Sequence, residues 1–167
     1  MKAAMKELIN KWICDFIADY EAQPEISTEW GEPIVGFADA YSPYIQNLPE
    51  LISSSHGLPQ DIMEDAASVI AYFVPFTRAL AKSNNNGGEY ASEQWANAYE
   101  QTNAMFGRLN SYIIDKLSEY GYMGAVHPAA GTFDHDNLIS DWSFRHFAYA
   151  AGLGTFGLNN MLITPKG

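Results

Sequence analysis

The residues of this sequence that could do chemistry are concentrated in its C-terminal third. Three aspartates, Asp134, Asp136 and Asp141, precede an adjacent arginine and histidine, Arg145 and His146. Carboxylates beside a histidine and an arginine can supply proton transfer and anion binding at one place. We therefore interpret the three aspartates and His146 as candidates for acid–base catalysis and Arg145 as an anion-binding group, and a network of surface ion pairs is the alternative.

The other histidines give weaker signals. Asp134-His135-Asp136 has the composition of a metal site. Adjacent residues on a strand or loop point in diverging directions, however, so three consecutive ligands for one ion are awkward, and we expect a solvated loop. His56 and His127 have no partner nearby in the sequence and are interpreted as structural.

The six residues from Gly152 to Gly157 match the dinucleotide-binding pattern GxGxxG letter for letter. That pattern works between a strand and a helix, whereas here a helix is expected before it and a strand after it, which disfavours nucleotide binding. Two interpretations remain, a helix stop with a tight turn and a bare backbone platform for a flat cofactor. On the platform interpretation, Gly154→Ala would weaken cofactor binding and change stability by no more than about 1 kcal/mol.

Apolar spacing predicts the elements that position these residues. Helices are predicted over 3–21, from Trp95 to near Gly121, and over 143–151. Strands are predicted over 34–38, 68–76, 122–127 and 161–165, with 68–76 a central strand because it shows no polar alternation. Residues 41–66 are expected to be loop and short helix, and 134–141 a polar loop. This order predicts a single α+β, or layered α/β, domain over 1–167.

Composition excludes several classes of protein. The chain has 167 residues and a net charge of −11, with 12 acidic and 3 basic residues in 1–66. It shows no basic patch, so we expect no binding to nucleic acid. Its single cysteine, Cys14, cannot hold an iron–sulfur cluster. Nothing resembles a targeting or membrane-spanning segment, and we expect a cytoplasmic protein with no membrane partner.

The segment Ser143–Asn160 resembles the region that precedes the cysteine-rich part of epoxyqueuosine reductase-like iron–sulfur proteins. An arginine–histidine helix, an AGLG turn and an apolar LI-x-P strand carry the resemblance. The segment is more distantly similar to corrinoid-dependent reductive dehalogenases. Further matches run back through Phe133-Asp134, Trp95–Tyr99, the Asn84 loop and Val35–Phe37.

The resemblance implies a fold and a site. The fold is the nitroreductase-like, cobalamin-binding one, a mixed sheet flanked by helices. A base-off cobalamin would lie near the 152–157 turn, one of the three aspartates would donate a proton, and Arg145 or His146 would orient substrate or cofactor. The implied cofactor-binding residues are Arg145, Gly152, Leu153, Gly154, Thr155, Gly157 and Asn159.

In that family a domain with two 4Fe–4S clusters follows and feeds electrons to the corrinoid. This sequence ends before such cysteines, so we expect the N-terminal half alone, without a cluster, and a ferredoxin-like domain or protein as electron donor. The acidic charge favours a small-molecule substrate over tRNA. The sequence leaves open whether the chain is itself an oxidoreductase and whether it forms a homo-oligomer. The alternatives are a flavin-binding, nitroreductase-like enzyme and a non-catalytic binding or assembly module.

Overall fold

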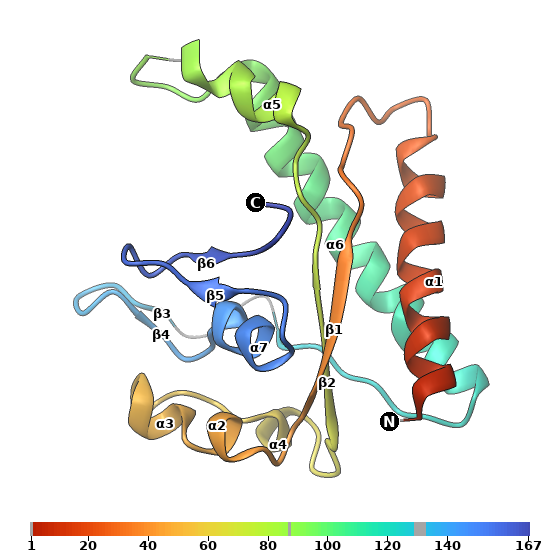
Figure 1. Cartoon of the computed structure of the whole chain (residues 1–167), viewed down its shortest axis with the longest axis vertical. Coiled ribbons are helices and arrows are strands. Elements are labelled where there is room, and N and C mark those ends of the chain that lie inside the picture. The colour runs from red at the N-terminus through yellow and green to blue at the C-terminus, as the bar shows by residue number, and fades with distance from the viewer. Residues whose placement is uncertain (1, 87, 129–132) are drawn as a thin grey trace. The chain divides into compact units, whose positions relative to one another are not determined.

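A computed structural model of the chain describes residues 2–86, 88–128 and 133–167 (Figure 1). Over these residues the protein is α+β, with helices and three two-stranded sheets. The chain divides into two compact units. Unit 1 comprises the described residues of 1–34 and 74–123 together with Lys166, and unit 2 those of 35–73 and 124–165 together with Gly167.

Unit 1 is built on two long helices, α1 (Ala3–Glu21) and α6 (Glu93–Glu119), which pack against each other. The predictions of both helices are confirmed. Their buried residues recur at three- and four-residue spacing, as in an amphipathic helix pair: Ile9, Ile13 and Ile17 on α1, and Leu109, Ile113 and Leu117 on α6. The short helices α5 (Arg78–Ser83) and η1 (Asn84–Asn86) precede α6 in the chain.

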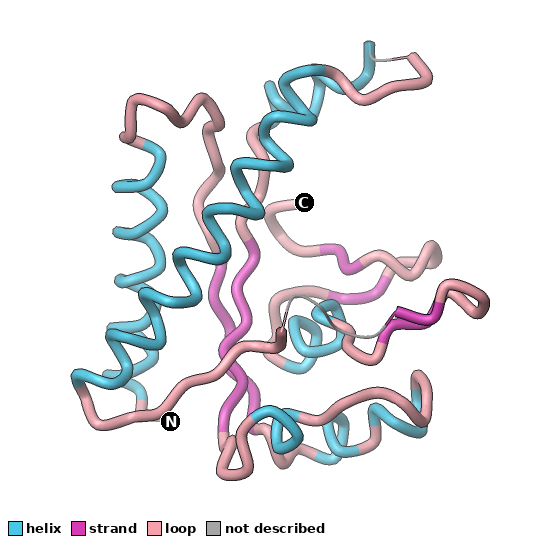
Figure 2. The backbone as a smooth tube through the Cα atoms, turned by 180° about the vertical axis from the view of Figure 1, so that it is seen from behind, coloured by secondary structure: helices cyan, strands magenta, loops and turns pink. Residues whose placement is uncertain are grey.

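Apart from Ile34, the longest strand pair belongs to unit 2: β1 (Ile34–Asp39) pairs with β2 (Ser68–Phe73), and Figure 2 shows the two as adjacent magenta segments. The pair is antiparallel, because the Ala40 N–H, just past β1, donates to the Ala67 carbonyl, just before β2. The prediction of a central strand is wrong for the described residues. There β2 pairs with β1 alone, and its six residues are half-buried. Their apolar run therefore reflects partial cover of both faces.

Four short helices complete the core of unit 2: α2 (Pro43–Gln46), α3 (Leu48–Leu51), α4 (Pro59–Ile62) and α7 (Phe144–Ala150). A proline in the first turn of α2, α3 and α4 starts each helix where its missing N–H costs nothing. The core joins Ala38 of β1, Ile45 of α2, Leu48 of α3 and Phe147 of α7. This packing fixes α7, which carries the predicted arginine–histidine pair.

Two small hairpins lie on either side of α7 in the chain. The first pairs β3 (Phe133–Asp134) with β4 (Ile139–Ser140), so the prediction of a plain loop over 134–141 is wrong. The second pairs β5 (Thr155–Phe156) with β6 (Leu162–Ile163), which confirms the C-terminal strand in shorter form. All three sheets in the described part of the chain are antiparallel, so the parallel pairing of a mixed sheet is not found there.

The strand predicted over 122–127 is wrong. Gly121, at φ +76°, ends α6, and residues 122–127 follow as irregular chain. Tyr122, Met123 and Val126 are exposed. Their β-rich composition makes no strand because a strand also needs a partner to receive its backbone hydrogen bonds.

Candidate functional site

The start of α7 is held by a buried histidine, His56. The Ser143 N–H donates to His56 Nε2 at 3.1 Å, and His56 Nδ1 lies 2.7 Å from the Gly57 carbonyl. Because Nε2 accepts, the proton lies on Nδ1, which donates to Gly57, so the ring is neutral. Burial lowers the pKa of His56, which favours the same neutral state. His56 therefore acts as a structural connector, in agreement with the interpretation from sequence.

A cluster of rings fixes the residues just before α7. Trp142 stacks on His127 with centroids 4.5 Å apart and on Phe147 at 4.4 Å, and His56 lies parallel to it at 6.0 Å. Phe147 belongs to the core, so the indole of Trp142 is anchored from within unit 2. The neighbouring backbone, including Asp141, is positioned with it.

Asp141 faces His127 across 4.0 Å, measured from Oδ1 to Nε2. Both side chains are largely buried, 25% and 13% exposed respectively. At this distance the two groups form an ion pair when the imidazole is protonated, and a small shift would bring them into hydrogen-bond range. A carboxylate beside an imidazole is an arrangement able to move a proton.

The His127–Asp141 pair lines a cavity of about 380 Å³. That volume lies within the range of small-molecule sites in proteins. The lining residues all come from unit 2: Ser55, Gly57, Asp61, Ile62, His127, Pro128, Asp141 and Trp142. The structure thus places one of the three predicted aspartates at a cavity, beside a histidine that the sequence did not single out.

Asp134, at the end of β3, and Asp136, in the turn that follows, are exposed and do not line this cavity. Asp134 accepts the backbone N–H groups of Asp136 and Asn137 at 2.9 and 3.0 Å and the Asn137 side-chain amide at 2.8 Å. These bonds, with the Asn137 amide first, hold the pKa of Asp134 below its ordinary value. Asp134 is therefore a turn-forming residue, and its carboxyl carries a proton near neutral pH even less often than that of an ordinary aspartate.

Arg145 and His146 occupy the first turn of α7 but do not line the cavity. The exposed Arg145 donates from Nη1 to the Asn160 carbonyl, which ties α7 to the β5–β6 turn. His146 Nδ1 lies 2.6 Å from Ser143 Oγ, and its ring contacts Phe156 with centroids 4.7 Å apart. Burial, and secondarily the charge of Arg145, lowers the pKa of His146.

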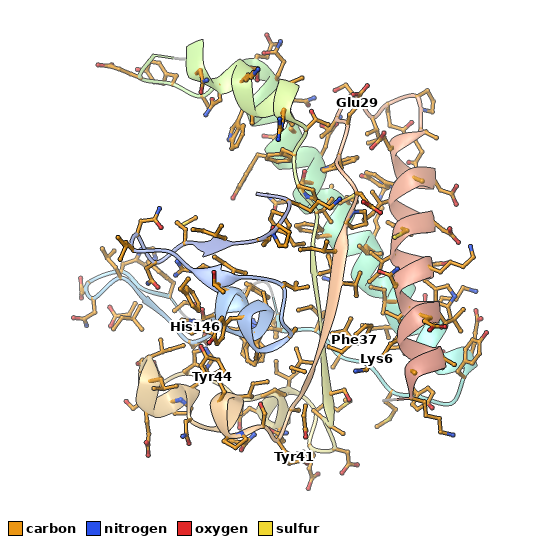
Figure 3. The ribbon with its side chains drawn as sticks, viewed as in Figure 1. Lys6, Glu29, Phe37, Tyr41, Tyr44 and His146 are labelled. Carbon is orange, nitrogen blue, oxygen red and sulfur yellow. The ribbon has the colours of Figure 1, made fainter. Side chains whose placement is uncertain are left out.

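The His146 side of unit 2 carries a row of rings. Figure 3 shows His146 on α7 and Tyr44 on α2. Tyr149 links them, because its ring lies 5.1 Å from that of Tyr44 and 5.5 Å from that of Phe156, which contacts His146. These contacts pack α7 between α2 and β5.

Gly152 ends α7 in the conformation expected of a helix stop. Its φ is +77°, and nothing lies within 4 Å of the position a Cβ would take. The Leu153 N–H donates to the Ala148 carbonyl at 3.0 Å and the Gly152 N–H to the Tyr149 carbonyl at 2.9 Å. This pair of bonds is a Schellman motif, which satisfies the last carbonyls of the helix. Leu153 is buried directly after it.

Close packing within the hairpin requires Gly154, because a backbone atom faces it, and leaves little space beside Gly157, where the tip of a side chain could move. A Cβ on Gly154 would lie 2.2 Å from the Ile163 carbonyl oxygen, and one on Gly157 2.8 Å from Ile163 Cδ1. Strand β6 therefore covers both bare positions, and only Gly152 keeps an open side. Thr155 and Asn159 are exposed, and Asn159 Oδ1 accepts the Met161 N–H at 3.2 Å.

Sequence reasoning missed His127 and also Gly36. His127 lies fourteen positions from Asp141, and only the fold brings the two together. Gly36 lies in β1 where a Cβ would come within 2.4 Å of the Ala151 carbonyl oxygen and 2.8 Å of Leu153 Cδ2. A glycine inside a predicted strand marks close approach of another backbone, so this signal was present in the sequence.

Comparison with protein-family models, with curated proteins and with solved structures finds no match to this chain. Among the described residues, no three or more histidine, cysteine, aspartate or glutamate side chains are arranged to hold a metal ion. Within the same residues, no helix has the length and apolar character needed to cross a membrane.

Proposed function

We propose that this chain is the cofactor-holding domain of a reductase of the kind that epoxyqueuosine reductase-like iron–sulfur proteins represent, and that it acts on a small molecule. The observation that carries the proposal is the His127–Asp141 pair at a cavity of small-molecule size. All three candidate aspartates come before the AGLG turn, on the side where the proposed proton donor of the resembled family lies, so the cavity is what selects Asp141. The finer fold assignment, nitroreductase-like and cobalamin-binding, is part of this proposal.

In this proposal Asp141 is the proton-donating aspartate, acting with His127. The Asp134 carboxylate accepts hydrogen bonds from Asp136 and Asn137, and Asp136 is exposed on the same hairpin. Of the three candidate aspartates, Asp141 is therefore the one that lines the cavity. A carboxylate and an imidazole with their side chains at most one-quarter exposed can hold a proton and deliver it to a bound substrate. Net acidity of the chain supports a small molecule over tRNA.

The residues of the 152–157 turn could contact a large cofactor that lies on the surface of the turn, but they leave no space that would enclose it. The open groups there are the bare side of Gly152, the exposed Thr155 and Asn159, and the Arg145 guanidinium. Gly154 and Gly157 offer no bare backbone, since β6 covers them. A corrinoid bound there would supply reducing chemistry at cobalt, with electrons from a ferredoxin-like domain or protein.

The test is a titration of the purified protein with hydroxocobalamin and, separately, with flavin mononucleotide, followed by visible absorbance. The proposal expects a saturable change of the corrinoid spectrum and none with the flavin. A change with the flavin alone would assign the nitroreductase-like alternative instead. No change with either would favour a binding or assembly module without a cofactor.

The role of Asp141 is tested by substitution in the loaded protein, with dithionite as electron donor and a panel of small molecules as substrates. Asp141→Asn is expected to lower kcat about 100-fold, because a positioned acid contributes at least that much. Asp136→Asn, which also removes one carboxylate from unit 2, is the matched control and should leave kcat unchanged. Equal losses in both variants would contradict the assignment.

A further inference from the structure

A serine hydroxyl and an imidazole nitrogen lie in close contact at the start of α7. Ser143 Oγ and His146 Nδ1 are 2.6 Å apart, and both side chains are half-buried. Within the described first turn of α7, no backbone N–H donates to the Ser143 hydroxyl, so this hydroxyl does not cap the helix. A hydroxyl and a base at this distance are the two groups that an activated serine nucleophile requires.

Packing holds both partners of this contact in place. The Ser143 backbone is fixed because its N–H donates to the buried His56 at 3.1 Å. The His146 imidazole lies against the Phe156 ring with centroids 4.7 Å apart, and Phe156 in turn contacts Tyr149. An activated nucleophile needs a base that a third group orients, and here an aromatic ring orients it.

The charge state of His146 suits a base. Burial, and secondarily the positive charge of Arg145, lowers the pKa of His146, so the imidazole is neutral near pH 7. A neutral ring with its proton on Nε2 has a lone pair on Nδ1, which can accept the Ser143 proton. The hydroxyl can therefore lose its proton as it attacks an electrophile.

We propose that Ser143 and His146 form a serine–histidine dyad that hydrolyses small carboxylic esters. Ser143 Oγ bonds to the acyl carbon, and its proton passes to His146 Nδ1. The bond between that carbon and the leaving alcohol breaks, and the alcohol takes the proton from His146. Water then attacks the acyl–serine ester with the same base, which releases the carboxylic acid and restores Ser143. The half-buried position of the hydroxyl limits the acyl group to a small one.

The first test treats the full chain with p-nitrophenyl acetate and locates the acetylated residues by mass spectrometry. Ser143 is expected to be acetylated and then to lose the acetyl group to water. His146→Gln removes the base and should lower the rate of Ser143 acetylation about 100-fold. His135→Gln, at an exposed position on the β3–β4 hairpin, is the matched control and should leave that rate unchanged. Absence of acetylation at Ser143, or equal rates in His146→Gln and the parent, would overturn the proposal.

A thiol at the same position tests the dyad without ester chemistry. In a Cys14→Ser background, which removes the one native thiol, Ser143→Cys and Ser55→Cys each carry a single cysteine. Ser55 is the more exposed, and its hydroxyl contacts that of Ser53 at 2.8 Å instead of an imidazole. A neighbouring imidazole favours the reactive thiolate. Iodoacetamide should therefore alkylate Ser143→Cys about tenfold faster than Ser55→Cys, the effect of lowering a thiol pKa by one unit. Equal rates, or a faster reaction of Ser55→Cys, would contradict the dyad.

This activity goes beyond the proposed reductase function, and the two proposals fail separately. The dyad uses neither the His127–Asp141 pair nor a cofactor, and neither of its residues lines the cavity beside His127. A negative corrinoid titration with Ser143 acetylation intact would remove the reductase assignment and leave the esterase dyad. A positive corrinoid titration without acetylation of Ser143 would leave the reductase and remove the dyad.

Discussion

Replacing Gly154 with alanine is expected to lower the free energy of unfolding by about 3 kcal/mol, at the upper end of overpacking costs. The new Cβ would stand 2.2 Å from the Ile163 carbonyl oxygen, a backbone atom that cannot rotate away. Relief requires β6 to move from β5, which breaks the pairing of Thr155 with Ile163. Urea unfolding followed by far-ultraviolet circular dichroism measures the loss.

Gly107 is the matched control for this substitution. It lies exposed inside α6, and nothing stands within 4 Å of the position its Cβ would take. Gly107→Ala should therefore stabilise the protein by about 0.5–1 kcal/mol, since alanine costs less backbone entropy in a helix. A Gly154→Ala variant as stable as the parent would show that β6 does not lie against the turn, and would restore the platform interpretation of the glycines.

The parts of the fold that sequence reasoning predicted correctly are those with strong periodicity. The stripe that includes Ile9, Ile13 and Ile17 is long enough to define α1 without any tertiary information, and the same holds for α6. The strand predicted over 122–127 failed because short β-rich segments become strands only when another strand pairs with them. Strand pairing depends on the whole fold, so it cannot be predicted from the six residues 122–127 alone.

The same distinction explains the site. Asp141 was one of three equivalent aspartates in the sequence, and what separates it from Asp134 is the set of bonds each makes in three dimensions. His127 and His56 had no visible partner because their partners are distant in sequence: Asp141 for the former and, 87 positions away, Ser143 for the latter. The glycines, by contrast, were recognised as constrained, but only the approach of Ile163 shows which constraint applies to Gly154.

Mild acid is expected to destabilise the protein through His56 and His146. The pKa of each is lowered in the folded state, chiefly by burial, so the unfolded chain binds protons first as the pH falls below about 6.5. Stability from these groups is therefore complete above that pH and is lost as the pH falls toward their folded pKa values. The free energy of unfolding can fall by up to about 1.4 kcal/mol per pH unit for each histidine. Urea unfolding at intervals from pH 7.5 to pH 5 measures this loss.

His56→Gln separates the contribution of His56 from that of His146. His56 is 3% exposed, and protonating Nε2 would remove the acceptor of the Ser143 N–H at the start of α7. A glutamine oxygen can accept that N–H at any pH, while the bond to Gly57 is lost, at a cost of about 1 kcal/mol at neutral pH. The variant should be less stable than the parent at neutral pH and should lose stability less steeply as the pH falls, so the two curves approach each other toward pH 5.

His135→Gln, at an exposed position on the β3–β4 hairpin, is the matched control and should follow the parent throughout. Parallel curves for the parent and His56→Gln would mean that His56 takes up its proton at the same pH in the folded protein as in the unfolded chain. The start of α7 would then be held by another contact.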